Sequence, residues 1–432
     1  MNKKILRLAI PNVISNISIP LLGLVDVGLM GHLGSQTYIG AIAIGSMIFN
    51  ILFWAFGFLR MGSSGFTAQA YGRRNFPEAV MVLARSLTLA VICGIAIILL
   101  QKPIAIVTFK LVGASTAVEN IVSQYYYIRV YAAPATIALM AIIGWLIGMQ
   151  NARTPMAIAI FVNGINILYS LFFVKVMGMK AEGIALASLL AQYTALLFAV
   201  WIVYRHYGKI FGSFTFAQLK DLKPFRNFLA VNKDIFIRTI LLILTISYFT
   251  VRSAQLGETV LAANTLLYQF LIFFSYFMDG FAFAAESLVG RYYGGNDKIL
   301  IRKTVKRLFV WGGGICIAFT LIFLLFGKII LNVLTDNIET LATANHYLFW
   351  IYLIPLASFT AFLWDGIYIG CTASVAMRNS MIISVVLLFF PLYFLVFNGM
   401  GNNGLWLAFI IFLASRGLLL QWQAGRQIYR KT

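Results

Sequence analysis

Residues 87–100 read Leu-Thr-Leu-Ala-Val-Ile-Cys-Gly-Ile-Ala-Ile-Ile-Leu-Leu, without a single charged side chain. They form the middle of an apolar window at 82–107, and about 20 apolar residues are enough for a helix to cross a bilayer while satisfying its own backbone hydrogen bonds. Of the 432 residues, 61% are hydrophobic and 11% are charged, whereas a soluble domain carries about 25% charged residues. The sequence therefore predicts an all-α, polytopic membrane protein.

Twelve membrane spans are expected when windows of about 19 residues are broken at charged residues and at clusters of Gly, Pro or Asn. They cover residues 10–30, 39–68, 82–107, 122–150, 156–177, 183–204, 233–255, 260–290, 307–334, 345–371, 377–398 and 402–422. Because twelve is an even number, both ends of the chain are expected on the same side of the membrane.

The net charge of +20 comes from 33 Lys and Arg residues that gather in alternate loops. One side receives both termini, the stretch from Arg205 to Lys233 and the stretch from Arg291 to Arg307, whereas the other side receives little beyond Lys110, Lys175, Lys180, Arg252 and Lys328. Under the positive-inside rule this pattern places both termini in the cytoplasm and argues against a basic face for nucleic acid. We expect a multi-pass protein of the cytoplasmic (inner) membrane.

The chain resembles itself after a displacement of about 222 residues. Ala-Gln-Ala-Tyr-Gly at 68–72 falls on Gly-Arg-Tyr-Tyr-Gly at 290–294, and Gly144 and Gly148 fall on Gly366 and Gly370. Each half then holds six helices, and two parallel repeats of this kind suit alternating access around a central cavity. We expect a six-helix lobe at 1–204, a cytoplasmic linker at 205–232 and a second six-helix lobe at 233–432, related by a pseudo-two-fold axis.

Asp26 is the one carboxylate of the first expected span. A charged side chain at the centre of a membrane helix costs about 2.5–3.5 kcal/mol and so calls for a reason. A carboxyl in a low dielectric that gains and loses a proton as its surroundings open and close would serve as a proton or cation coupling site. The alternative is a structural pair with an Asn, Ser or Arg of a neighbouring helix, and the sequence leaves both open.

Polar side chains that could serve Asp26 occur in the fifth and sixth spans. Asn163, Asn166 and Ser170 share one helical face, and Ser188 adds a hydroxyl on the next helix. Hydrogen bonds that hold helices together are the alternative role for these side chains.

In the second half, Asp279, Glu286 and Asp365 lie within expected spans, and Asp279 and Glu286 are two helical turns apart on one face. They are candidates for a second cation or substrate site. Arg60, Arg238 and Arg416 are possible counter-charges, so structural ion pairs are the rival explanation.

Catalytic motifs of the kinds HExxH and GxSxG with a partner His are missing from the sequence, and we expect neither an enzyme nor a cofactor. The run Gly312-Gly313-Gly314 lacks the strand and the Lys-Ser/Thr of a phosphate loop, so close helix packing is expected there. Cys93, Cys316 and Cys371 lie far apart and are expected to act as small buried hydrophobic residues.

Several segments together resemble the multidrug and toxin extrusion (MATE) family, and within it the DinF-like branch. They are Ala9-Ile10-Pro11-Asn12, Leu24-Val25-Asp26, Gly31-His32-Leu33-Gly34, Gly57-Phe58-Leu59-Arg60-Met61-Gly62, Arg238-Thr239, Asp279-Gly280-Phe281-Ala282 and Trp364-Asp365-Gly366. Their order along twelve spans is more specific than any one of them. The resemblance implies a V-shaped pair of six-helix lobes.

The resemblance also implies export of organic, often cationic, compounds against an inward flow of protons or sodium ions. It gives Asp26 the role of the coupling aspartate, Pro11 that of the proline at which the first helix bends, and Asn166 that of an amide near the coupling site. The family often has a second aspartate where this chain has Ser170. Without that carboxylate a sodium site is weakened, and a proton site with one carboxylate is the simpler hypothesis.

The sequence thus predicts a secondary antiporter for amphipathic, cationic drugs or metabolites, with the bilayer and small organic substrates as partners, acting as a monomer. A flippase of a lipid-linked precursor is the first alternative, although cationic residues in the cavity would be expected there to hold pyrophosphate. A channel or receptor is the second, against which the two-fold repeat argues.

Overall fold

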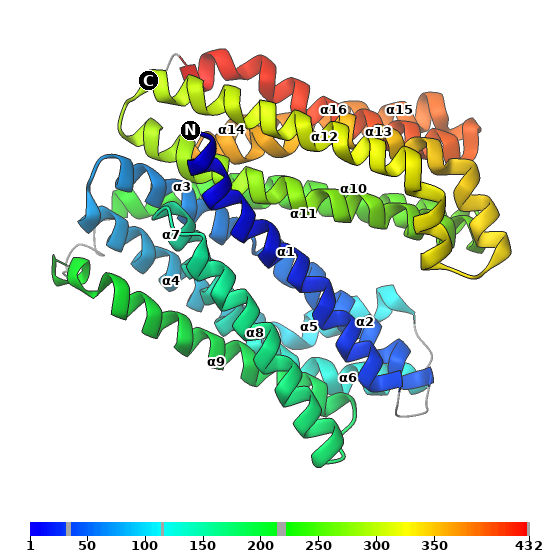
Figure 1. The fold of residues 1–432 in the computed structure, drawn as a ribbon. Coiled ribbons are helices and arrows are strands. Elements are labelled where there is room, and N and C mark those ends of the chain that lie inside the picture. The colour runs from blue at the N-terminus through cyan, green and yellow to red at the C-terminus, as the bar shows by residue number, and fades with distance from the viewer. Residues whose placement is uncertain (32–35, 114–115, 214–221, 430–432) are drawn as a thin grey trace. The chain divides into compact units, whose positions relative to one another are not determined.

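The computed structural model describes residues 1–31, 36–113, 116–213 and 222–429, except for the side chains of residues 19, 21–31, 36–37, 39, 111–112, 213 and 222. Within these ranges every regular element is a helix (Figure 1). This confirms the predicted all-α fold class.

Among the described residues of the first half, nine α-helices form six membrane crossings, since several crossings consist of two consecutive helices. The helices are α1 Asn2–Gly31, α2 Gln36–Ala55, α3 Phe58–Gly72, α4 Phe76–Leu99, α5 Gln101–Val112, α6 Thr116–Arg129, α7 Ala133–Gly148, α8 Arg153–Leu171 and α9 Ala181–Tyr207. A π-helical turn, Phe172–Val176, extends α8, and 3₁₀ turns at Val130–Ala132 and Gly208–Ser213 follow α6 and α9.

The described part of the second half also forms six crossings. The first four are the single helices α10 Leu222–Gln255, α11 Glu258–Gly294, α12 Lys298–Leu334 and α13 Ile338–Gly370. The next crossing combines α14 Ser374–Ile382, a π-helical segment Ile383–Phe389, α15 Phe390–Leu392 and a second π-helical segment Tyr393–Phe397. After the 3₁₀ turn Asn398–Met400, the last crossing is α16 Gly401–Ala424, followed by the π-helical turn Gly425–Tyr429.

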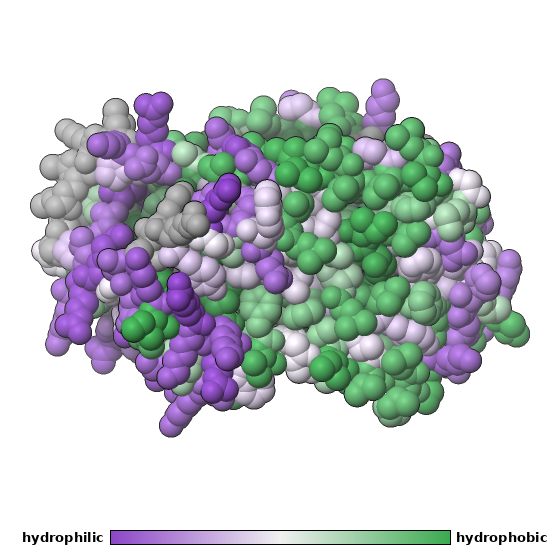
Figure 2. All heavy atoms as spheres, turned by 90° about the horizontal axis from the view of Figure 1, so that it is seen from above, coloured by the Kyte–Doolittle hydropathy of each residue, from purple (hydrophilic) through white to green (hydrophobic). Residues whose placement is uncertain are grey.

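Ten helical runs in the described ranges are long and apolar enough to cross a membrane, and the last of them, Ser374–Tyr429, is long enough for two crossings. With α1 this gives the twelve predicted spans. In Figure 2 hydrophobic residues occupy the middle of the visible face and hydrophilic residues gather at its two ends, as expected for a bilayer-spanning surface.

The two halves repeat each other at the level of single backbone torsions. All four described non-glycine residues with positive φ fall into two pairs 222 positions apart: Arg74 and Asn296 at 57° and 56°, and Gln150 and Thr372 at 65° and 52°. The hydrogen bonds around them match as well. For example, Asn75 N–H donates to the carbonyl of Ala70, as Asp297 N–H does to Tyr292. Helices α3, α7, α11 and α13 thus share one left-handed C-terminal motif.

Glycines let helices approach closely at equivalent places in both halves. A methyl group at Gly144 would collide with the backbone oxygen of Arg60, and one at Gly366 with that of Ala282, which is 222 positions after Arg60. Such contacts of α7 with α3, and of α13 with α11, require glycine because the backbones nearly touch. The predicted repeat therefore has a structural basis.

Two compact units make up the chain, one from residues 14–228 and the other from residues 1–13 together with 229–432. We call them the first lobe and the second lobe. The first thirteen residues thus belong to the second lobe, where Val13 lies against Gly280. The lobe boundary before Leu229 lies within the stretch 205–232 that was predicted to be a linker, and α10 already begins at Leu222.

Candidate functional site

A polar cluster in the apolar first lobe joins α8 to α9. The amide of Asn166 donates to the hydroxyl oxygen of Ser188 at 3.2 Å, and Ser170 donates to Oδ1 of Asn166 at 3.2 Å. All three side chains are buried, with exposed fractions of 1%, 0% and 1%. The structure therefore brings together the predicted residues Asn166, Ser170 and Ser188. Counting the described residues, one N–H and one lone pair of the Asn166 amide are left over for a further partner.

Helix α1 contacts α8 at Asn163, about one helical turn before Asn166. The amide of Asn163 donates to both the backbone oxygen and the hydroxyl of Ser18, each at 3.1 Å. Helix α1 runs without interruption through Pro11 and Pro20 to Gly31 and thus includes Asp26. The side chain of Asp26 lies outside the described part of the structure, so its predicted role stays a prediction.

The second lobe holds a buried ion cluster centred on Asp365 of α13. Oδ2 of this carboxylate accepts a hydrogen bond from Arg416 of α16 at 2.7 Å and is also paired with Arg238 of α10. The exposed fractions of Asp365, Arg238 and Arg416 are 9%, 7% and 6%. Two of the three predicted counter-charges are therefore ion-pair partners of Asp365, which supports the structural explanation for this carboxylate.

Asp279 and Glu286 lie on α11, and Asp279 interacts electrostatically with Arg416. Asp279 thus belongs to the surroundings of the same cluster. Glu286 is 1% exposed, and its backbone oxygen faces Gly370 of α13. Glu286 therefore occupies a close contact between α11 and α13, two turns beyond Asp279.

Two further polar networks in the second lobe were not assigned any role by sequence reasoning. Asn264 and Asn402 exchange amide hydrogen bonds of 2.7 and 3.0 Å, and the indole of Trp406 donates to Oδ1 of Asn264 at 2.8 Å. Asp234 pairs with Arg378 at 2.7 Å and accepts from Ser374 at 2.9 Å. The Asn pair connects α11 to α16, and the Asp234 pair connects α10 to α14, so both hold helices of the lobe together.

The Asn166 cluster of the first lobe and the Asp365 cluster of the second lobe do not lie at equivalent positions of the repeat, although the backbones of the two halves correspond. The positions 222 residues after Asn166, Ser170 and Ser188 are Leu388, Leu392 and Ile410. Conversely, the positions 222 residues before Arg238, Asp365 and Arg416 are Asn16, Ile143 and Thr194. The first lobe therefore carries an uncharged amide and hydroxyl centre and the second a charged one, which indicates different roles for two lobes of the same fold.

A family model named MatE matches the chain twice, at residues 11–172 and 235–395, in the two halves that the backbone torsions already relate. The chain belongs to the MATE family. Among curated MATE relatives, the DNA damage-inducible protein F of Escherichia coli K12 is 37% identical over 97% of this chain and 91% of its own length. The human multidrug and toxin extrusion protein 1 is 24% identical over 70% of this chain and 53% of its own length.

Solved MATE structures share the fold of the whole chain. A MATE transporter in the bent conformation superposes with a TM-score of 0.87 at 18% identity, covering 98% of this chain and 95% of its own. A multidrug resistance MATE transporter of the MOP superfamily in the outward-facing conformation gives 0.85 at 19% identity, covering 100% and 97%. The predicted family and MATE-like architecture are thus confirmed, and the chain is a multi-pass membrane protein.

Proposed function

We propose that this chain is a secondary antiporter that exports organic, amphipathic and cationic compounds in exchange for protons, with Asp26 as the coupling carboxylate. The observation that carries the proposal is the buried cluster of Asn166, Ser170 and Ser188, which offers an amide but no charge of its own. A carboxylate beside such a cluster accepts hydrogen bonds from uncharged groups and has no permanent counter-ion. Its negative charge can therefore be neutralised by binding a proton.

The contact of Ser18 with Asn163 supports the placement of Asp26 near this cluster. As the first and fifth crossings, α1 and α8 run in the same direction through the membrane (Figure 1). Eight residues beyond Ser18, Asp26 is about 12 Å further along α1, and seven residues beyond Asn163, Ser170 is about 10 Å further along α8. The two residues are therefore expected at the same depth.

The charges of the second lobe favour the first lobe as the coupling site. Asp365 is shared by two buried guanidinium groups, and breaking a buried ion pair of this kind is strongly unfavourable. Asp26, which the family resemblance makes the coupling residue, is then the better candidate for proton binding. Relatives named multidrug and toxin extrusion proteins support organic compounds as the exported class.

Efflux from proteoliposomes tests the proposal. The protein is reconstituted with a fluorescent organic cation inside, and a proton gradient or a sodium gradient is imposed separately. We expect proton-driven efflux in the wild type, its loss in Asp26→Asn and its retention in Asp336→Asn, a surface carboxylate that serves as the matched control.

Three outcomes would contradict the proposal. Efflux driven by sodium alone would replace the proton as coupling ion. Efflux that survives in Asp26→Asn but is lost in Asp279→Asn would move coupling to the second lobe. If neither gradient drives efflux, while a lipid-linked sugar pyrophosphate crosses the bilayer, the chain is a flippase instead.

We further propose that the protein lies in the cytoplasmic membrane with both termini and the Arg205–Lys233 stretch inside the cell, since these carry the excess of Lys and Arg. Single cysteines introduced at Asp297 and Asp336 of a cysteine-free variant test the orientation. A membrane-impermeant maleimide added to intact spheroplasts should label the cysteine at position 336 and not the one at 297, and the reverse labelling would invert the orientation.

A further inference from the structure

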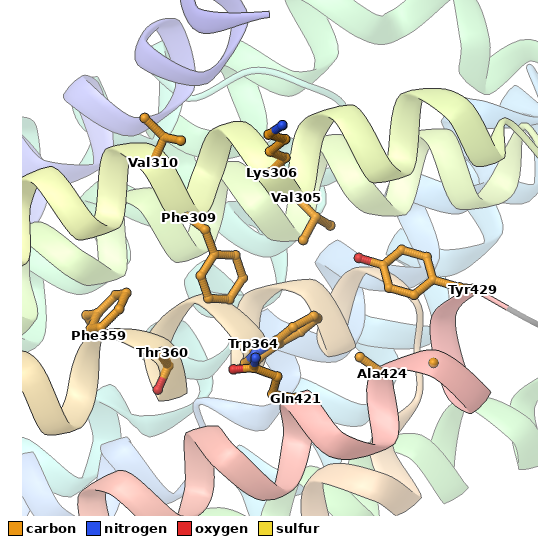
Figure 3. A pocket seen from close by; sticks show the side chains of 11 residues that line it. Val305, Lys306, Phe309, Val310, Phe359, Thr360, Trp364, Gln421, Ala424 and Tyr429 are labelled. Carbon is orange, nitrogen blue, oxygen red and sulfur yellow. The ribbon is translucent and has the colours of Figure 1, made fainter.

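A cavity of about 670 Å³ opens on the second lobe where α12, α13 and the end of α16 meet. In Figure 3, Val305 and Phe309 of α12 point toward Phe359, Thr360 and Trp364 of α13, and the Tyr429 hydroxyl points in from the C-terminal π-helical turn. The polar cluster of the first lobe and the ion cluster around Asp365 contribute none of the lining residues. The cavity is therefore a separate feature of the second lobe.

Four of the eleven lining residues are aromatic, and one of the four, Trp364, carries a buried hydrogen-bond donor. Phe309 packs against the Trp364 ring, with centroids 5.2 Å apart. Trp364 is 4% exposed, and its buried indole N–H has no hydrogen-bond partner among the residues that the structure describes. A buried indole N–H usually finds an acceptor, because burial without a hydrogen bond leaves the cost of removing the group from water uncompensated. The cavity thus suits an apolar ligand that carries a hydrogen-bond acceptor.

Basic side chains lie at one end of the cavity, and exposed apolar side chains lie at the other. Lys306 is at the rim, and the guanidinium of Arg302, one turn earlier on α12, lies 5.6 Å from the centre of the Tyr429 ring. In the opposite direction along α12, Val310 and Ile317 are 59% and 60% exposed. None of the lining residues is acidic. A ligand with an anionic head and an apolar tail matches this order.

We propose that the cavity binds an anionic phospholipid of the adjacent membrane leaflet. Its phosphate lies against Lys306 and Arg302, an acyl chain runs along Phe309 and Val310, and a glycerol ester carbonyl accepts the indole N–H of Trp364. A membrane lipid fits better than a transported solute because the apolar rim continues into the bilayer-facing surface of α12. Under the orientation proposed above, this leaflet is the cytoplasmic one.

Quenching of Trp364 fluorescence by brominated lipids tests the proposal on the full-length protein. Nanodiscs of phosphatidylcholine receive increasing fractions of phosphatidylglycerol with dibrominated acyl chains, or of equally brominated phosphatidylcholine. The contribution of Trp364 is the difference between each protein and its Trp364→Phe form. We expect brominated phosphatidylglycerol to quench Trp364 at a lower lipid fraction than brominated phosphatidylcholine does.

Two double variants of α12 separate the site from the general charge of the helix. Arg302→Gln/Lys306→Gln should weaken the effect of phosphatidylglycerol about thirtyfold, which corresponds to about 1 kcal/mol per cation. Lys303→Gln/Arg307→Gln removes equal charge from the same stretch of α12, away from the lining residue Lys306 and the contact of Arg302 with Tyr429, and should leave the quenching nearly unchanged. Size-exclusion chromatography checks that each variant keeps the elution volume of the folded protein.

Three results would overturn the inference. Equal quenching by both brominated lipids would show that the head charge is not recognised. Equal losses in the two double variants would attribute the preference to surface potential alone. Relief of quenching by millimolar inorganic phosphate would identify a site for free phosphate rather than for a lipid.

Discussion

Arg416 of α16 donates a 2.7 Å hydrogen bond to Oδ2 of Asp365 on α13, the same oxygen that pairs with Arg238 of α10. One carboxylate oxygen thus links three helices. Arg416 lies 51 positions and Arg238 lies 127 positions from Asp365 in the sequence. Because all three side chains are buried, each charge depends on the others for the solvation that water would otherwise give.

Removal of the central carboxylate should therefore destabilise the protein strongly. Asp365→Asn leaves two buried guanidinium groups without their ion-pair partner, and loss of one member of a buried pair costs about 3–5 kcal/mol. We expect a clearly lower midpoint of thermal unfolding in detergent, followed by intrinsic fluorescence. The exposed Asp336→Asn should unfold like the wild type. A midpoint for Asp365→Asn equal to that of this control would mean that water reaches the cluster.

The repeat predicts paired effects of glycine substitution. Gly366→Ala and its counterpart Gly144→Ala each force a methyl group against the backbone of a neighbouring helix, and such overpacking costs about 1–3 kcal/mol. Both variants should lose thermal stability, as measured by the same assay. The methyl group of Gly313→Ala meets no described atom within 4 Å, and this variant should be neutral or slightly stabilising, since alanine favours a helix by about 1 kcal/mol. Equal effects at all three positions would argue against the close approach.

Ser170 allows a test of coupling by a single carboxylate. In Ser170→Asp a second acid joins Asn166 in the buried cluster, and two carboxylates that share a site cannot both ionise easily. The pair then keeps a proton to higher pH than Asp26 alone, so the pH of half-maximal proton-driven efflux should rise by about one unit or more. Ser170→Asn adds an uncharged side chain of the same shape and should leave the pH profile in place. A profile that does not move in Ser170→Asp would separate Asp26 from this cluster.

Cys371 provides a probe of packing at the end of α13. Its side chain is 3% exposed, and burial raises the pKa of the thiol. Since the thiolate is the reactive form, a protein with Cys371 as its only cysteine should react with a maleimide at least tenfold more slowly at pH 7.5 than one with a single cysteine at position 336. Both should react at similar rates in sodium dodecyl sulfate. Fast labelling of native Cys371 would show that the end of α13 opens.

Residue patterns that act locally were readable from the sequence. Long apolar windows predicted all twelve crossings because a helix in lipid needs a continuous apolar stretch, whatever its neighbours. The repeat could be predicted from the displacement of about 222 residues because a close helix contact requires glycine. The sequence therefore has glycine at equivalent positions of both halves, such as Gly144 and Gly366. The predicted face of Asn166 and Ser170 also follows from helical geometry alone.

Other features depend on which helices meet, and only the tertiary structure decided them. Three arginines were possible partners of three carboxylates in the sequence, and helix packing selected Arg238 and Arg416 for Asp365. Close helix packing was predicted for the run Gly312-Gly313-Gly314. The structure bears this out at Gly312, where an added methyl group would collide with Leu363, but not at Gly313 and Gly314, where it would meet no described atom within 4 Å. Apolar composition brings a segment into the bilayer, where lipid and neighbouring helices are equally apolar, so composition alone cannot say which face meets a helix.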